Sequence, residues 1–276
     1  MSTAIPMVRV PDFQFGGDIP RWWFMGDRVL TRHSDALHML FPEGERFFVR
    51  SVRHYAKRIT DPVLKARVKG FIGQEAVHGK AHEHAFVLLE RDGLEFRSWL
   101  KGYQRLAWGI LEPLAPPRLR LSVTVALEHL TATLGEAAFV DGLLDHAHPE
   151  MADLLLWHAA EELEHKAVAF DVYTAIGGGW LVRVLGMVIA LVGLGGFWRS
   201  AARHLLHQDG GFRARDLREM NRRLKAQGYN RNTLFITALK DYLRPGFHPD
   251  DRDNLHHAVE FFAHHPVFGG HASPAR

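Results

Sequence analysis

The 276-residue chain contains no cysteine. Disulfides, thiolate metal sites and iron–sulfur clusters are therefore excluded, and a metal ion could be held only by oxygen and nitrogen ligands. A glycine-rich phosphate loop and a Gly-x-Ser-x-Gly motif are also missing, and the glycines at 177–179 are better explained as the end of a helix. The N-terminus lacks the apolar stretch of a secretory signal, so we expect a cytoplasmic protein.

A large excess of either charge is absent too. The net charge is +3, from 34 Lys and Arg against 31 Asp and Glu, which hardly indicates an anionic partner. The basic run 213–225 predicts an amphipathic helix with a solvated face; contact with a membrane surface is the alternative, and nucleic acid is not expected.

Long runs that alternate polar and apolar residues are lacking, which indicates an all-α fold. We predict an irregular segment at 1–42, a four-helix bundle at 43–179 and a C-terminal helical extension at 180–276. The predicted bundle helices are 43–59, 62–91, 118–144 and 149–176, with a crossover helix at 94–111. Asp61 and Pro62 are a typical N-cap and first residue for the second of them.

One pattern occurs twice. Glu75 and His78 form a Glu-x-x-His motif on the second predicted helix, and Glu162 and His165 form another on the fourth. Residues three apart share a helix face, so one metal ion can touch both. A single Glu-x-x-His motif often arises by chance and faces solvent. Both copies here have apolar neighbours, which indicates burial, and buried carboxylates must be paired or coordinated.

Each motif has a partner glutamate on the preceding helix. Glu45 and Glu75 are equally far from Thr60 along the chain, so they lie at one height in an antiparallel helix pair, at about 1.5 Å per residue. Glu128 and Glu162 flank the loop around Asp145 in the same way. Four Glu and two His in this order predict a dinuclear metal site inside a four-helix bundle.

Several segments together resemble a bacterial family called predicted metal-dependent hydrolases: RFFVRSVRHY, FIGQEAVHGKAHEH, ALEHLTA, WHAAEELEHKAVAFDVY and DYLRPGFHPDD. The resemblance covers about residues 40 to 255 and implies a helical, metal-dependent protein. The ligand order is also similar to that of ferritin-like di-iron carboxylate proteins. Carried over by position, the resemblance implies these metal ligands: Glu45, Glu75, His78, Glu128, Glu162 and His165.

The sequence leaves the roles of several residues near the predicted ligands undecided. Glu161 shares a face with His165 and competes with Glu162 as the ligand. His82 and His158 are expected at the same end of the site, where either could be an additional ligand or a proton relay, so His82, His158 and Glu161 are the catalytic candidates. Glu136 and His248 are weaker candidates, whereas His129 is expected to be structural.

We predict an O₂-dependent di-iron carboxylate oxidoreductase with two Fe ions, Mn or Zn being the alternative metals. The first alternative function is a dinuclear metal-dependent hydrolase, in which two metal ions activate a water molecule. The second is a non-enzymatic, membrane-associated metal-binding protein.

The apolar segment 180–198 bears on the substrate. It is 19 residues long, carries one charge at Arg183, and has a tryptophan at each end. We expect it to be buried, in the chain or in a homodimer; peripheral contact with the inner face of a membrane and a true span are the alternatives. Apolar surface beside the fourth helix predicts an apolar or lipid-like substrate.

Overall fold

The computed structural model describes residues 4–226, 229, 231–265 and 268. Within that part of the chain the regular elements are all helices, apart from one isolated β-bridge between Phe24 and Ala147. The all-α prediction is therefore confirmed.

The helices are α1 (Arg28–Tyr55), η1 (Ala56–Arg58), α2 (Pro62–His84), α3 (Phe86–Arg91), α4 (Arg97–Tyr103), η2 (Gln104–Leu111), α5 (Glu112–Leu114), α6 (Pro117–Val140), η3 (Leu143–His146), α7 (Pro149–His165), α8 (Val168–Ala175), α9 (Trp180–Gln208), α10 (Ala214–Ala226), α11 (Arg231–Leu243), η4 (Pro249–Asp251) and α12 (Leu255–His264).

The first helix is longer than the sequence predicts. It starts at Arg28, after Asp27, whose side chain accepts a hydrogen bond from the Leu30 backbone N–H as an N-cap. The sequence predicts Pro42 to be part of an irregular segment 1–42, but it lies inside α1 and is buried. Burial of the apolar face around Met39 and Leu40 outweighs the hydrogen bond that proline removes. The predicted boundary at residue 42 is wrong for this reason.

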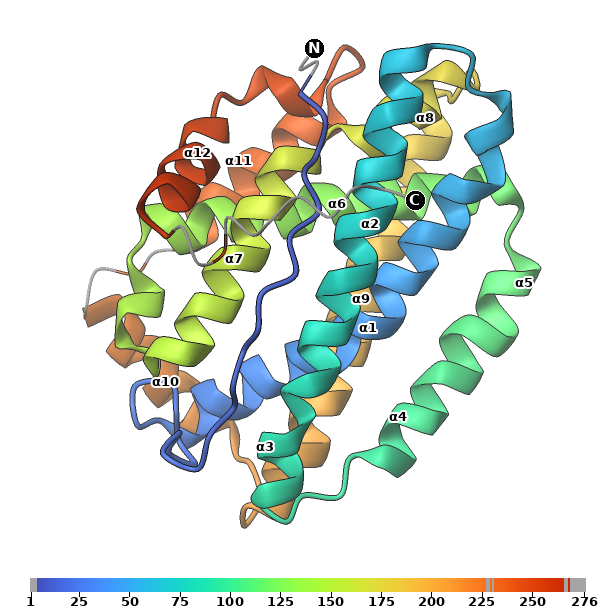
Figure 1. Ribbon diagram of the computed structural model, residues 1–276. Helices are drawn as coiled ribbons and strands as arrows, with labels where there is room; N and C mark the ends of the chain where they lie inside the picture. The colour runs from blue at the N-terminus through green and yellow to red at the C-terminus, as the bar shows by residue number, and fades with distance from the viewer. Residues whose placement is uncertain (1–3, 227–228, 230, 266–267, 269–276) are drawn as a thin grey trace.

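The second helix begins as predicted, because Asp61 accepts hydrogen bonds from the backbone of Val63 and Leu64, and Pro62 is the first helical residue. The second and fourth predicted helices are both interrupted. A turn separates α2 from α3, and residues 166–167 separate α7 from α8. The predicted crossover runs through α4, η2 and α5 and lies to one side of α1 and α2 (Figure 1).

The chain before α1 forms an N-terminal strap, residues 6–9, that runs between α2 and α7 (Figure 1). Two glycines of α2 make room for it. A Cβ at Gly70 would lie 2.3 Å from the Pro6 carbonyl oxygen, and a Cβ at Gly73 would lie 2.4 Å from Val8 Cγ2. Side chains at these two positions would push the strap away from α2.

The apolar segment forms the first part of α9, which packs along α1 and α6. Arg183 is buried and donates hydrogen bonds to the carbonyl oxygens of Arg244 and Phe247, and a Cβ at Gly186 would clash with Ser122. Among the described helices, α9 alone is long and apolar enough to cross a membrane, with 22% of its most apolar window buried, which is weak evidence for membrane association. A homodimer and a peripheral membrane contact stay predictions, as does the division at residue 180.

Candidate metal centre

The six predicted metal ligands meet in the interior of the protein. Glu45 comes from α1, Glu75 and His78 from α2, Glu128 from α6, and Glu162 and His165 from α7. None is more than 2% exposed. Ligand atoms of Glu45, Glu75 and His78 lie within 4.8 Å of one another, and those of Glu75, Glu128 and His165 form a second such group. Glu75 belongs to both groups, which suits a shared, bridging carboxylate.

Many polar atoms of this cluster have no hydrogen-bond partner. They are both carboxylate oxygens of Glu45, Glu75 and Glu128, together with His78 Nδ1 and His165 Nε2. Buried polar groups are rarely left unpaired, and an unpaired buried carboxylate is strongly destabilising. The donor set of carboxylate oxygens and imidazole nitrogens therefore fits divalent metal ions.

The electrostatics of the cluster lead to the same conclusion. Burial, reinforced by the neighbouring carboxylates, raises the pKa of Glu45 and of Glu128 well above the usual range. Burial alone would lower the pKa of His165, but the charge of Glu162 and Glu128 raises it. Without a cation, the carboxylates repel one another in a medium that hardly screens them.

His165 is oriented by a glutamine. Its Nδ1 lies 2.9 Å from Gln74 Oε1, and Gln74 Nε2 in turn donates to the Met7 carbonyl oxygen and to Glu164. Because the amide nitrogen is used by these acceptors, Oε1 must accept from His165, which places the ring proton on Nδ1. In the neutral form of the ring that a metal ion requires, Nε2 therefore carries the lone pair, and it faces the carboxylates, 3.0 Å from Glu75 Oε1 and 3.4 Å from Glu128 Oε2.

His78 is oriented by a carboxylate. Its Nε2 lies 2.9 Å from Glu161 Oε2, and its unpaired Nδ1 lies 3.9 Å from Glu162 Oε1. Arg9 of the N-terminal strap donates to Glu161 and to Glu164. Glu161 thus sits behind His78, whereas Glu162 faces the cluster. Outer partners of this kind fix the orientation and basicity of metal-binding histidines.

The two further histidines form a chain that ends in the cluster. His158 Nε2 lies 2.9 Å from Glu162 Oε1, and His158 Nδ1 lies 2.6 Å from His82 Nε2. His82 Nδ1 continues to His38 Nδ1 at 2.7 Å. Ligand atoms of Glu45, His82 and His158 lie within 4.8 Å of one another. Both roles expected for His82 and His158, additional ligand or proton relay, are compatible with this geometry.

The weaker candidates lie outside the cluster. Glu136 accepts hydrogen bonds from Arg252 and Asn254. His248 Nε2 lies 2.9 Å from Asp171 Oδ1, and His129 Nε2 lies 2.9 Å from the Ala238 carbonyl oxygen. These three side chains tie α6 and α8 to residues 238–254.

Arg9, His38 and Glu164 escaped the sequence-based prediction. Arg9 and His38 lie in the segment predicted to be irregular, where no periodicity marks a position as buried, and Glu164 is a common helix-surface residue type. Gln74, which was also not singled out, offered a signal because it directly precedes Glu75 in the first motif.

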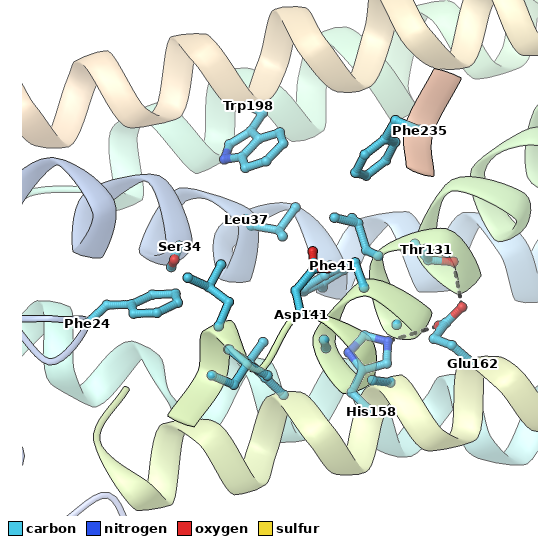
Figure 2. A pocket seen from close by; sticks show the side chains of 18 residues that line it. Phe24, Ser34, Leu37, Phe41, Thr131, Asp141, His158, Glu162, Trp198 and Phe235 are labelled. Atoms are coloured by element: carbon cyan, nitrogen blue, oxygen red, sulfur yellow. Dashed lines mark hydrogen bonds and ion pairs between the residues drawn. The ribbon is translucent and has the colours of Figure 1, made fainter. Parts of the chain in front are cut away.

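Two cavities lead towards the cluster from the surface. Cavity A, of about 130 Å³, extends from Phe24 and Trp198 to His158 and Glu162 (Figure 2). Cavity B, of about 180 Å³, lies between α1, η2, α6 and α9 and reaches Glu45. The two cavities share these wall residues: Leu37, Phe41, Thr131 and Leu134.

A family model described as "predicted metal-dependent hydrolase" matches residues 7–253. No curated protein and no solved structure matches the chain significantly. The family description overturns the predicted di-iron oxidoreductase and favours the hydrolase alternative. Carboxylate-rich helical sites favour a redox interpretation, but the ligand set by itself does not separate oxidation from hydrolysis.

Proposed function

Because the chain belongs to the family of predicted metal-dependent hydrolases, we propose that it is a dinuclear metal-dependent hydrolase. The observation that carries this proposal is the set of buried carboxylate oxygens and imidazole nitrogens that have no hydrogen-bond partner in the described structure. Removing several carboxylates from water without a cation would be very costly, so the cluster is best explained as a metal centre.

We assign the metal ligands to Glu45, Glu75, His78, Glu128, Glu162 and His165. The donor set suits Mn(II), Fe(II) or Zn(II). We further propose that α1, α2, α6 and α7 form a ferritin-like four-helix bundle, in which two helices carry a Glu-x-x-His motif and two carry a single glutamate.

When bound, divalent ions supply Lewis-acid polarisation of the attacked group and lower the pKa of a water molecule. The chain contributes a dry cluster in which Glu161 and Gln74 hold the imidazoles of His78 and His165 in one orientation. His158 faces the inner end of cavity A, so a substrate there meets an imidazole and the carboxylate of Glu162 (Figure 2).

A carboxylic ester or amide suits the cavities better than a phosphate ester. Among the described residues that line cavities A and B, Arg120 is the one cationic side chain, and it lies 4.0 Å from Glu112. Phosphate recognition uses arginines, lysines or helix N-termini as partners for the negative charge. An uncharged carbonyl group needs no such partner.

The test is hydrolysis by protein freed of metal with a chelator and then loaded with Mn(II), Fe(II) or Zn(II). p-Nitrophenyl acetate, a p-nitroanilide and bis-p-nitrophenyl phosphate represent the three substrate classes. We expect metal-dependent turnover of the acetate or the anilide, and its loss in Glu128→Gln and His165→Ala.

Glu83→Gln is the matched control, because Glu83 lies on α2 with an exposed side chain that pairs with Arg46. It should retain full activity. His158→Ala distinguishes the two roles open to that residue, additional ligand and proton relay. If His158 is a ligand, the variant binds less metal; if it is a proton relay, metal content stays the same and only turnover falls. Equal turnover with and without metal, or in Glu128→Gln and the wild type, would refute the hydrolase.

A further inference from the structure

Cavity B has the composition of a site for a hydrocarbon chain. Its wall is built mainly from aliphatic and aromatic side chains of α1, the crossover, α6 and α9, among them Leu40, Phe47, Trp108, Leu127 and Phe197. Its two charged residues on the outer side, Glu112 and Arg120, partly neutralise each other, and Glu112 also pairs with Arg50. Pockets lined mainly by apolar and aromatic side chains are typical binding sites for the apolar parts of ligands.

The inner end of cavity B reaches the metal centre. Glu45, one of the assigned ligands, lines the cavity, and both of its carboxylate oxygens are buried without a partner. Phe41 and Thr131 belong to the walls of both cavities, and Thr131 donates a hydrogen bond to Glu162. A ligand that fills cavity B would therefore place its inner end beside the cluster.

The outer end of cavity B opens on an apolar surface. Leu111 of η2 and Ile189 of α9 line the cavity, yet they are 50% and 39% exposed, so the mouth lies between these helices. Further exposed apolar side chains follow along both helices and along α5: Leu106, Ile110, Leu114, Leu181, Leu185, Val188 and Val192. An apolar chain can pass such an entrance without leaving an apolar environment.

The backbone of the crossover also departs from regular helix at this place. Residues 104–111 form a π-helix, and Ala107, Trp108 and Leu111 from it line cavity B. A π-helical segment is rare and is frequently found at functional sites.

We propose that cavity B binds the hydrocarbon chain of an amphiphilic substrate, a long-chain ester or amide, with its reactive group at the Glu45 end. The identity and placement of the reactive group depend on the proposed hydrolase function, whereas the hydrocarbon-chain site depends only on the cavity. The chain enters between η2 and α9, and its burial provides the binding free energy, because each buried methylene contributes about a four-fold gain in affinity.

Gly193 allows the cavity to be filled by mutation. It lines cavity B, and a Cβ at this position meets no atom within 4 Å, so a larger side chain can enter without a clash. Gly196 is the matched control, since it lies on the same helix, has equal space around its Cβ and is absent from the wall.

The first measurement is direct binding of cis-parinaric acid, a fluorescent long-chain fatty acid, to wild-type protein. We expect saturable binding that is weakened about ten-fold or more in Gly193→Phe, which removes space for two or more methylenes, and unchanged in Gly196→Phe. Helical circular dichroism and metal content check the folding of both variants. Ala107→Phe, on the opposite wall, is a second variant should Gly193→Phe fail to fold.

The second measurement is hydrolysis of p-nitrophenyl acetate and p-nitrophenyl laurate. Gly193→Phe should lose its preference for the laurate, whereas Gly196→Phe should hydrolyse both esters as the wild type does. Absence of fatty-acid binding, or equal binding in wild type and Gly193→Phe, would overturn the chain site even if the protein hydrolyses the acetate. Binding that Gly193→Phe abolishes, without turnover of either ester, would support the chain site and refute the hydrolase.

Discussion

At the scale of single residues, neighbouring glutamates of α7 have different surroundings. Glu162 lies within reach of His158, His165 and Thr131 inside the cluster, whereas Glu161 is held between His78 and Arg9. Replacing a metal ligand removes a bond to the metal. Replacing an outer partner of a ligand changes only the orientation and basicity of an imidazole, so the two replacements affect metal binding differently.

We therefore expect Glu162→Gln to lower the number of metal ions bound per chain. Glu161→Gln should keep the number and weaken the affinity by about 10- to 100-fold. Competition with a chromophoric chelator and elemental analysis measure both quantities. The two variants differ in position by one residue and are each other's control. Identical metal content and affinity in both would contradict the assignment.

Glu136 provides a second test, remote from the cluster. Burial would raise its pKa, but hydrogen bonds from Arg252 and Asn254 outweigh burial and hold the pKa below its ordinary value. A carboxyl group with a lowered pKa in the folded state stabilises the fold above the unfolded-state value, and this stabilisation is lost as the pH falls through the folded-state value.

We expect Glu136→Gln to lower the free energy of unfolding at neutral pH by about 1–3 kcal/mol. The difference from wild type should shrink below about pH 4.5, the ordinary value for this group. Urea unfolding at several pH values measures it. A difference that does not change with pH would show that the charge of Glu136 is not what stabilises the fold.

At the scale of elements, the N-terminal strap contacts residues that lie behind the candidate metal centre. Its Arg9 is the ion-pair partner of both Glu161 and Glu164, and Gln74 bonds to its backbone at Met7. The strap reaches these residues only because α2 has no side chain at Gly70 and Gly73.

Gly70→Ala should therefore lower the free energy of unfolding by about 1–3 kcal/mol, since the added Cβ meets the Pro6 carbonyl oxygen and forces the strap to shift. Metal affinity should fall with it. Gly102→Ala in α4 is the control, because its Cβ would meet nothing within 4 Å, and alanine there should be neutral or stabilising by up to about 1 kcal/mol. Thermal unfolding and chelator competition compare the two, and an equal response of both variants would argue against the strap.

At the scale of the whole molecule, four helices each contribute a glutamate to the buried cluster. Glu45, Glu75, Glu128 and Glu162 come from four different helices and are all buried. Metal ions bound between them would link α1, α2, α6 and α7, and binding that favours the folded state adds to its stability.

We expect removal of metal to lower the midpoint of thermal unfolding, and Mn(II), Fe(II) or Zn(II) to restore it. A metal concentration about 100 times the dissociation constant corresponds to roughly 2.7 kcal/mol. Calorimetry with and without a chelator measures the change, with Glu128→Gln as the variant that should not respond. A wild-type protein that binds at most traces of metal and gains no stability would falsify the metal centre.

The sequence by itself determined the helical class, the start of α2 and the six residues that meet in the cluster, because these depend on local periodicity, capping and spacing along a helix. Only the tertiary structure decided that α1 begins at Arg28, that Glu161 lies between His78 and Arg9, and that His38 ends the histidine chain behind the cluster. These features depend on contacts between segments far apart in the chain, which no local pattern encodes. The choice between hydrolysis and oxidation came from family membership, because both chemistries use the same ligand types.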